Sequence, residues 1–171
     1  MSRRTSLRQF QQYLIDRLST LAHGEGASSL LCIQVGESRW LLNLSESGEI
    51  VTLPPLTSVP LTQPSFAGLA NIRGNLFAVT DFAAFLGEGA TPLNTPGARL
   101  LLVGLKQGNN AALLVPRILG LKNPADLEPG PHPADAPDWN PATLVDAAGQ
   151  KWRQLDLKRL LSDTQFMNIA A

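Results

Sequence analysis

The sequence predicts a mainly β fold of the sandwich or barrel type. Many short apolar stretches of strand length are separated by turn residues, about every eight to twelve residues along the chain. One amphipathic helical stretch precedes these segments and a short helical stretch follows them. All 13 prolines lie at or after Pro54, so the later connections are expected to be constrained loops. Together these observations favour a β-sandwich or barrel with a helix at each end.

Composition limits the kinds of partner that the chain can bind. The 171 residues carry 14 Lys and Arg against 14 Asp and Glu, so the basic footprint of a nucleic-acid or anionic-membrane binder is missing. No apolar signal region follows Met1, and no run of about 18 apolar residues occurs. We therefore expect a soluble, cytoplasmic protein without direct membrane insertion. Cys32 is the single cysteine and is expected to be a small core residue.

The first predicted element is an amphipathic helix from Ser6 to Ala22. Its apolar residues recur three or four positions apart with polar residues between them, and Gly24 follows as a left-handed stop. The apolar residues are Leu7, Phe10, Leu14, Leu18 and Leu21. Two roles are open for this stripe: it packs on the chain's own β-core, or it docks a partner.

Most of the later segments are expected to pair as β-hairpins. The apolar stretches have strand composition, and the residues between them are turn formers. The expected pairs are residues 30–35 with 39–44, 99–105 with 111–115, and 143–145 with 151–155. Residues 49–53 form a further strand that Pro54 stops, and Asp156 opens a final helix over 157–161. Residues 162–171 are expected to be a frayed tail.

Residues 68–87 are the stretch around which the remainder is expected to be organised. Gly74 and Asn75 tolerate positive φ and are predicted to form a turn. An apolar strand over 76–79 follows, and Asp81 caps a short helix over 82–86. The sequence thus predicts a turn, a buried strand and a helix within twenty residues.

Arg73 is the residue in this stretch that most needs an explanation. Arg73 and Asp81 are the only charged residues between positions 68 and 87. If Arg73 lies in a strand, its side chain shares a face with Asn71, and its guanidinium needs a carboxylate or a ligand. Glu49 and Asp81 are the candidate carboxylates. Arg73 therefore either forms a structural ion pair with Glu49 or contacts a partner protein.

Catalysis has little support in the residues. His23 and His132 are expected at a helix end and in a Pro-rich loop, and nothing marks a nucleophile. The sequence has no Cys/His cluster typical of zinc and no Gly-rich phosphate loop. We therefore expect no enzyme activity, cofactor or metal. The alternative class is a β-barrel module that binds a small ligand or oligosaccharide, although the three tryptophans are scattered along the chain.

The central stretch resembles the signature of the CheW-like chemotaxis coupling adaptors, GVxNLRGxxxPVxDLxxxLG. Residues 68–74 read GLANIRG, and residues 77–82 read FAVTDF. Glu49 and Ile50 are similar to the family's Glu-Ile pair, and the resemblance extends over residues 29–162. Three residues depart from the family pattern. Ala78 stands where a proline is usual, Phe82 replaces a leucine, and Pro116 replaces an aspartate.

The resemblance implies two intertwined five-stranded SH3-like β-barrel subdomains in residues 29–162. Residues 1–28 would be a helical extension, similar to the PilI-like branch of type IV pilus (twitching) signalling, and residues 163–171 a tail. The implied function is that of a non-catalytic adaptor in chemotaxis or pilus motility. It would couple the cytoplasmic tip of a transmembrane, methyl-accepting chemoreceptor to the regulatory domain of a CheA-like histidine kinase.

The implied partner-binding centre consists of Glu49, Asn71, Arg73, Gly74 and Asp81. By resemblance, the receptor tip would enter the groove between the subdomains, and the kinase domain would pack on the strands of the first subdomain. Asn71 and Gly74 would hold the turn. Arg73 and Glu49 would form the pair that shapes the receptor-facing surface.

Overall fold

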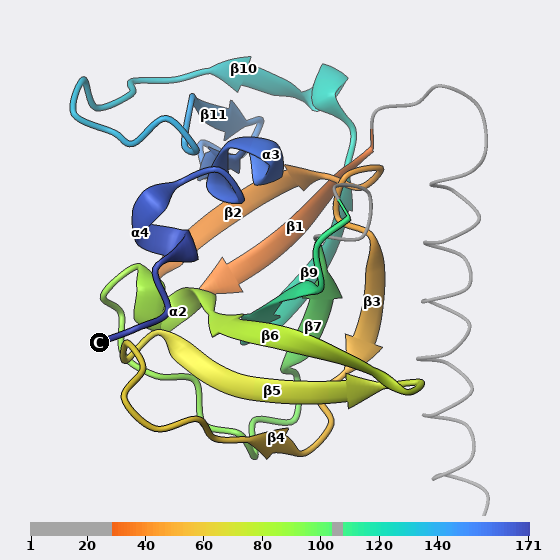
Figure 1. Cartoon of the computed structure of the whole chain (residues 1–171). Coiled ribbons are helices and arrows are strands. Elements are labelled where there is room, and N and C mark those ends of the chain that lie inside the picture. Colours follow the sequence, from red (N-terminus) through yellow and green to blue (C-terminus); the bar gives the residue numbers. More distant parts are fainter. Residues whose placement is uncertain (1–28, 104–107) are drawn as a thin grey trace, which may run out of the picture.

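Two β-sheets make up the body of the computed structural model, which describes residues 29–103 and 108–171 (Figure 1). The predicted N-terminal helix lies outside these residues. Sheet A holds β1 (Leu30–Val35), β2 (Ser38–Asn43), β9 (Arg117–Lys122), β10 (Leu127–Pro129), β11 (Thr143–Asp146) and β12 (Lys151–Leu155). Sheet B holds β3 (Glu49–Thr52), β4 (Leu56–Thr57), β5 (Phe66–Ile72), β6 (Asn75–Asp81), β7 (Arg99–Leu102) and β8 (Ala111–Val115). The mainly β prediction is confirmed.

The three expected hairpins are present in the described residues. β1 pairs with β2, β7 with β8, and β11 with β12, and each pair is antiparallel. The first pair lies in the core, because both of its strands place runs of consecutive apolar side chains there. Residue 105, the last of one predicted strand, lies outside the described residues. The two-residue strand β4 was not predicted from the sequence.

Two parallel pairs join parts of the chain that are far apart in sequence. β12 lies parallel to β2, and β6 lies parallel to β8. The chain leaves sheet A after β2, builds all of sheet B, and returns to sheet A with β9. The sheets are therefore intertwined in sequence. The hairpin pattern predicted only the antiparallel neighbours.

Short connections hold the edges of each sheet close together. The edge strands of sheet B are β3 and β4, which the chain joins through residues 53–55. The edge strands of sheet A are β9 and β10, which it joins through residues 123–126. Each sheet must therefore curl until its edges approach. Each has six strands in the order found here, where the resemblance implied five.

An aspartate begins each of the short α-helices in the described residues. Asp81 caps α2 (Phe82–Phe85), Asp156 caps α3 (Leu157–Leu160), and Asp163 caps α4 (Thr164–Met167). The predicted caps at Asp81 and Asp156 are confirmed. The frayed tail expected over residues 162–171 was wrong: its first part forms α4, and an antiparallel bridge then joins Ala170 to Thr62.

The largest core cluster lies between the two sheets and beneath the helices. Trp40 of β2 packs edge-on against Phe82 of α2, with ring centroids 5.3 Å apart. Trp139 packs against both rings. Cys32 belongs to a separate cluster of sheet A, where burial raises the pKa of its thiol to about 11. The expectation that Cys32 is a core residue is confirmed.

Candidate functional site

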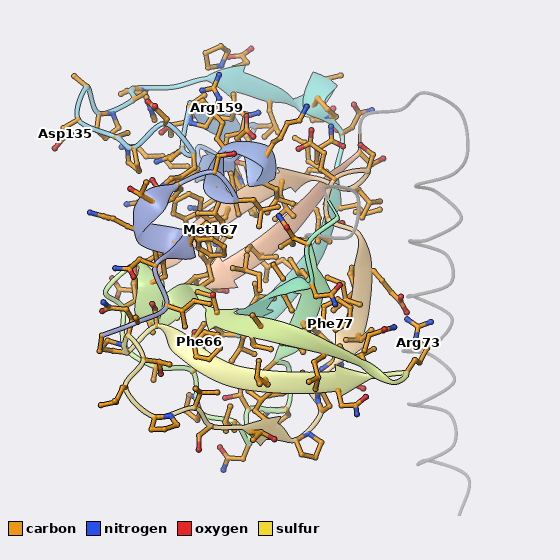
Figure 2. All side chains as sticks on the ribbon, viewed as in Figure 1. Phe66, Arg73, Phe77, Asp135, Arg159 and Met167 are labelled. Carbon is orange, nitrogen blue, oxygen red and sulfur yellow. The ribbon has the colours of Figure 1, made fainter. Side chains whose placement is uncertain are left out.

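Arg73 lies at the tip of the β5–β6 hairpin, which projects from one end of sheet B (Figure 2). Ile72 pairs with Asn75, so the loop consists of Arg73 and Gly74 alone. The sequence-based placement of Arg73 in a strand, with Gly74 and Asn75 as the turn, was therefore wrong by one residue. Asn75 is the first residue of β6.

Both residues of this loop have left-handed backbone conformations. Arg73 has φ 52° and Gly74 has φ 85°. Positive φ at both positions is the requirement of a type I′ turn, which matches the twist of a hairpin and favours Asn or Gly. The side-chain Oδ1 of Asn71 accepts a hydrogen bond from the Gly74 backbone nitrogen at 3.0 Å. Asn71 and Gly74 thus hold the turn, at a local conformational cost for Arg73.

The Arg73 guanidinium forms an ion pair with the Glu49 carboxylate. Glu49 opens β3, which is not hydrogen-bonded to β5 or β6, so the pair joins two separate parts of sheet B. The side chains are 68% and 44% exposed, respectively. Exposed pairs of this kind contribute about 0–1 kcal/mol to stability. The pair exists as expected, but a large structural contribution does not follow.

Asp81 lies at the other end of β6 and is only 4% exposed. Its carboxylate accepts hydrogen bonds from the Ala83 and Ala84 backbone nitrogens of α2. It also accepts bonds from the backbone nitrogen and hydroxyl of Thr91, at 2.6 and 2.9 Å. Asp81 therefore fixes α2 and the following loop from inside the protein. Glu49, Asn71, Arg73 and Gly74 come together at the tip, and Asp81 does not join them.

An exposed leucine beside the tip was missed from the sequence. Leu76 lies on β6 directly across from Asn71, and 56% of its surface is exposed. Its apolar neighbours along the strand suggested a buried position. The alternation of side chains along a strand could have revealed its exposure. Phe77 and Val79 are buried, so Leu76 lies on the opposite, exposed face of the strand. The tip thus combines an ion pair with an exposed apolar side chain.

Sheet A contains a second charged cluster, built around Trp152. The indole Nε1 donates to Asp146 Oδ2 at 2.9 Å, and Lys122 Nζ lies 3.5 Å from the same oxygen. Lys122 also lies over the Trp152 ring, 5.0 Å from its centroid. The Trp152 hydrogen bond, together with two backbone donors and Lys122, lowers the pKa of Asp146. Trp152 is buried, so this cluster lies in the interior of sheet A.

Two further kinds of site were sought in residues 29–103 and 108–171. No group of three His, Cys, Asp or Glu side chains in these residues is placed to hold a metal ion. None of their helices is long and apolar enough to cross a membrane.

Comparison with known proteins identifies relatives of similar sequence. Chemotaxis protein CheW of Rhizobium meliloti is 27% identical over 67% of this chain and 72% of its own length. Protein PilI of Pseudomonas aeruginosa is 30% identical over 53% of this chain, a match that spans 49% of PilI. Protein FrzA of Myxococcus xanthus is 27% identical over 76% of this chain and 81% of its own length.

A solved structure has the same fold. The scaffolding protein TtCheW from Thermoanaerobacter tengcongensis superimposes with a TM-score of 0.63 over 78% of this chain and 86% of that one, at 19% identity. The sequence profile of the CheW-like domain matches residues 29–165, which contain both sheets and the Arg73 tip. The chain therefore belongs to the CheW-like domain family of chemotaxis and motility signalling proteins.

Proposed function

We propose that this protein is a non-catalytic adaptor that couples a chemoreceptor to the regulatory domain of a CheA-like histidine kinase. The pathway would be chemotaxis or pilus motility, since relatives from both share the domain. The observation that carries the proposal is the exposed Arg73–Glu49 pair at the hairpin tip. The receptor's cytoplasmic tip is the proposed contact, which places the complex in the cytoplasm.

The tip is suited to protein recognition because it is both rigid and accessible. A two-residue turn leaves the hairpin little freedom, and the Asn71 side chain closes it. The exposed guanidinium keeps donors that a receptor carboxylate can share with Glu49. Leu76 adds apolar area next to these charges. An apolar contact bordered by charged groups is typical of a protein interface.

The domain arrangement implied by the family is part of the proposal. Each sheet, with edges joined by a short connection, would close into an SH3-like barrel, and residues 29–162 would form the two-barrel domain. Residues 1–28 would extend it as a helix and residues 163–171 as its terminal segment. The receptor tip would enter between the barrels, while the kinase domain packs on the strands of one of them.

The adaptor function is tested by titrating the protein with a receptor cytoplasmic fragment and, separately, with the kinase regulatory domain. Arg73→Glu reverses the charge at the tip and places a second carboxylate opposite Glu49, so we expect receptor binding to fall at least tenfold. Arg117→Glu is the matched control, because Arg117 is an exposed arginine on β9 of the other sheet. It should bind the receptor fragment like the wild type.

Melting temperatures of both variants show whether the fold is intact. Equal loss of receptor binding in Arg73→Glu and Arg117→Glu would indicate a general charge effect and contradict a role for the tip. A wild-type protein that bound neither fragment would rule out the adaptor function.

A further inference from the structure

Ser29, the first described residue, marks where the N-terminal stretch of the chain enters the fold. The Leu44 backbone nitrogen donates to the Ser29 carbonyl oxygen at 3.1 Å. Leu30, the next residue, pairs with Lys122 at the end of β9, and β3 begins five residues after Leu44. Figure 1 shows β3 on the side of the molecule where β1 begins. The stretch before Ser29 therefore enters the fold next to the end of β9 and the start of β3.

Both of these strands are edges of their sheets. In the described part of the chain, β9 pairs only with β1, and β3 only with β7, so one side of each backbone has no strand partner. Proteins often cover such an edge with a helix or a loop, because a bare edge can pair with another chain. The other two edge strands, β4 and β10, have only two and three residues. The longer edges, β3 and β9, therefore have the greater need of a cover.

The same two strands border the core between the sheets. Ile50 of β3, with Ile118 and Leu121 of β9, packs against the largest core cluster, and all three remain partly exposed. Leu119 has no pairing partner at the register shift between β1 and β9, and it is 37% exposed. A segment lying along both strands would remove this apolar surface from water, which is favourable in proportion to the area covered.

The stretch before Ser29 has the length and pattern of such a segment. The helix predicted over residues 6–22 would be about 25 Å long, and the six residues of β9 span about 20 Å. The apolar stripe of this helix has five members, so it needs an apolar surface to cover it. Residues 23–29 reach at most roughly 25 Å, which keeps the stripe near its point of entry.

The short connection favours the chain's own stripe over a stripe from another molecule. A flexible tether of this length gives a local concentration on the order of millimolar. A separate partner would have to exceed that concentration, or bind more tightly, to occupy the same apolar surface.

We propose that residues 6–22 dock as a helix along β3 and β9 of the same molecule, with the apolar stripe over Ile50, Ile118 and Leu121. This contact goes beyond the proposed adaptor function and does not depend on it. Glu49 and Ile50 are consecutive in β3, so their side chains point to opposite faces. The docked helix therefore leaves the Arg73–Glu49 pair exposed.

A spin label on the full chain tests where the stripe lies. Ser19→Cys puts a thiol on the face of the predicted helix opposite the stripe, where a nitroxide does not disturb the contact. Cys32 stays unlabelled, because it is buried and burial raises the pKa of its thiol to about 11. The nitroxide broadens the NMR signals of nearby amides. We expect selective broadening along β3 and β9, and much weaker broadening in residues 164–171.

Two aspartate variants of the labelled chain provide matched controls. Leu14 lies in the stripe and Gln12 on the opposite face, so Leu14→Asp and Gln12→Asp add the same helix-disfavouring residue to opposite faces. We expect Leu14→Asp to abolish the selective broadening and to lower the melting temperature by about 4 °C or more, because it removes a buried leucine. Gln12→Asp should keep the broadening and the melting temperature of the parent.

Three results would overturn this docking. The first is broadening confined to the residues next to Ser29, which indicates a tail without a fixed place. The second is an equal effect of the two aspartate variants. The third comes from a mixture of spin-labelled protein with isotope-labelled protein that has no nitroxide, where broadening of β3 and β9 shows that the stripe docks on a second copy.

Discussion

At the scale of single residues, Arg73 departs from the local preference of its position. Its position in the turn favours Asn or Gly, yet it holds an arginine whose salt bridge to Glu49 is largely exposed. Neither the backbone nor the ion pair provides a strong structural reason for this residue. The proposed recognition of a partner would provide one, because an exposed guanidinium on a rigid turn is costly for the fold but useful for binding.

Replacing Arg73 with Asn should separate stability from binding. Asn adopts left-handed φ more readily than Arg, so Arg73→Asn should raise the free energy of unfolding by about 0.5–1 kcal/mol after the small loss of the Glu49 pair. Receptor binding should weaken by at least tenfold, because the guanidinium is gone. Urea unfolding and a binding titration on the same sample measure both quantities. A variant that is clearly less stable would mean that the Glu49 pair matters more than its exposure indicates.

Asp146 makes the free energy of unfolding depend on pH in the acid range. The pKa of Asp146 is lowered in the folded protein, mainly by the Trp152 hydrogen bond. The contribution of its charge to the free energy of unfolding is therefore fully present above pH 3.8, the ordinary pKa of this carboxyl group. That contribution is lost as the pH falls below 3.8 and through the lower folded pKa. We expect Asp146→Asn to be less stable than the wild type at about pH 6, with the difference shrinking under acid.

Urea unfolding of both proteins at several pH values measures this effect. A difference between the two proteins that stays constant down to the acid limit would show that the Asp146 charge is not its source.

At the scale of elements, the hairpins could be predicted and their turns only in part. Short apolar stretches and turn residues identify β1, β2, β7, β8, β11 and β12, because both signals are local. The β5–β6 turn was misplaced because Gly74-Asn75 is also a good turn pair, and sequence does not reveal which of two adjacent pairs closes the loop. The β4 and β10 strands were missed because their pairing depends on distant strands rather than on their own composition.

Gly68 is the residue that allows β4 and β5 to pair. It lies at the register shift of β5 with φ 133°, and a Cβ atom there would come within 2.5 Å of the Thr57 carbonyl oxygen. Gly68→Ala should therefore destabilise the fold by about 2 kcal/mol or more, through backbone strain and loss of β4 pairing.

Gly89 gives a matched control. It also has positive φ, at 88°, but no atom lies within 4 Å of its added Cβ. Gly89→Ala should therefore cost only the conformational part, about 1 kcal/mol. Equal losses in the free energy of unfolding for Gly68→Ala and Gly89→Ala would show that the close contact with the Thr57 carbonyl oxygen does not add to the cost at Gly68.

At the scale of the whole molecule, the family could be recognised from the sequence, but the distribution of functional surfaces could not. The motif around Arg73 is local and identifiable. Asp81 belongs to the same motif and was expected at the same site, yet a strand of seven residues carries it to the other end, where it is buried. The meeting of residues 61–63 with the C-terminal segment was also not predictable, because it joins positions more than a hundred residues apart.

The resulting molecule has two ends that differ in charge. The Arg73 tip carries an exposed ion pair. The other end, where Thr62 and Ala170 form a bridge, is neutral, because residues 50–72 and 164–171 contain no Asp, Glu, Lys, Arg or His. The proposed adaptor would need surfaces that two partners can occupy together, which surfaces at opposite ends of one hairpin would allow. We therefore expect the two proposed partners to bind simultaneously rather than alternately.

The most direct test is titration of the kinase regulatory domain into protein already saturated with the receptor fragment, followed by sedimentation to measure the mass of the complex. We expect a ternary complex, with a kinase affinity within a few fold of the affinity measured without receptor. Arg73→Glu should lose the receptor from this complex and keep the kinase domain. Displacement of one partner by the other would contradict simultaneous binding of the receptor and the kinase domain.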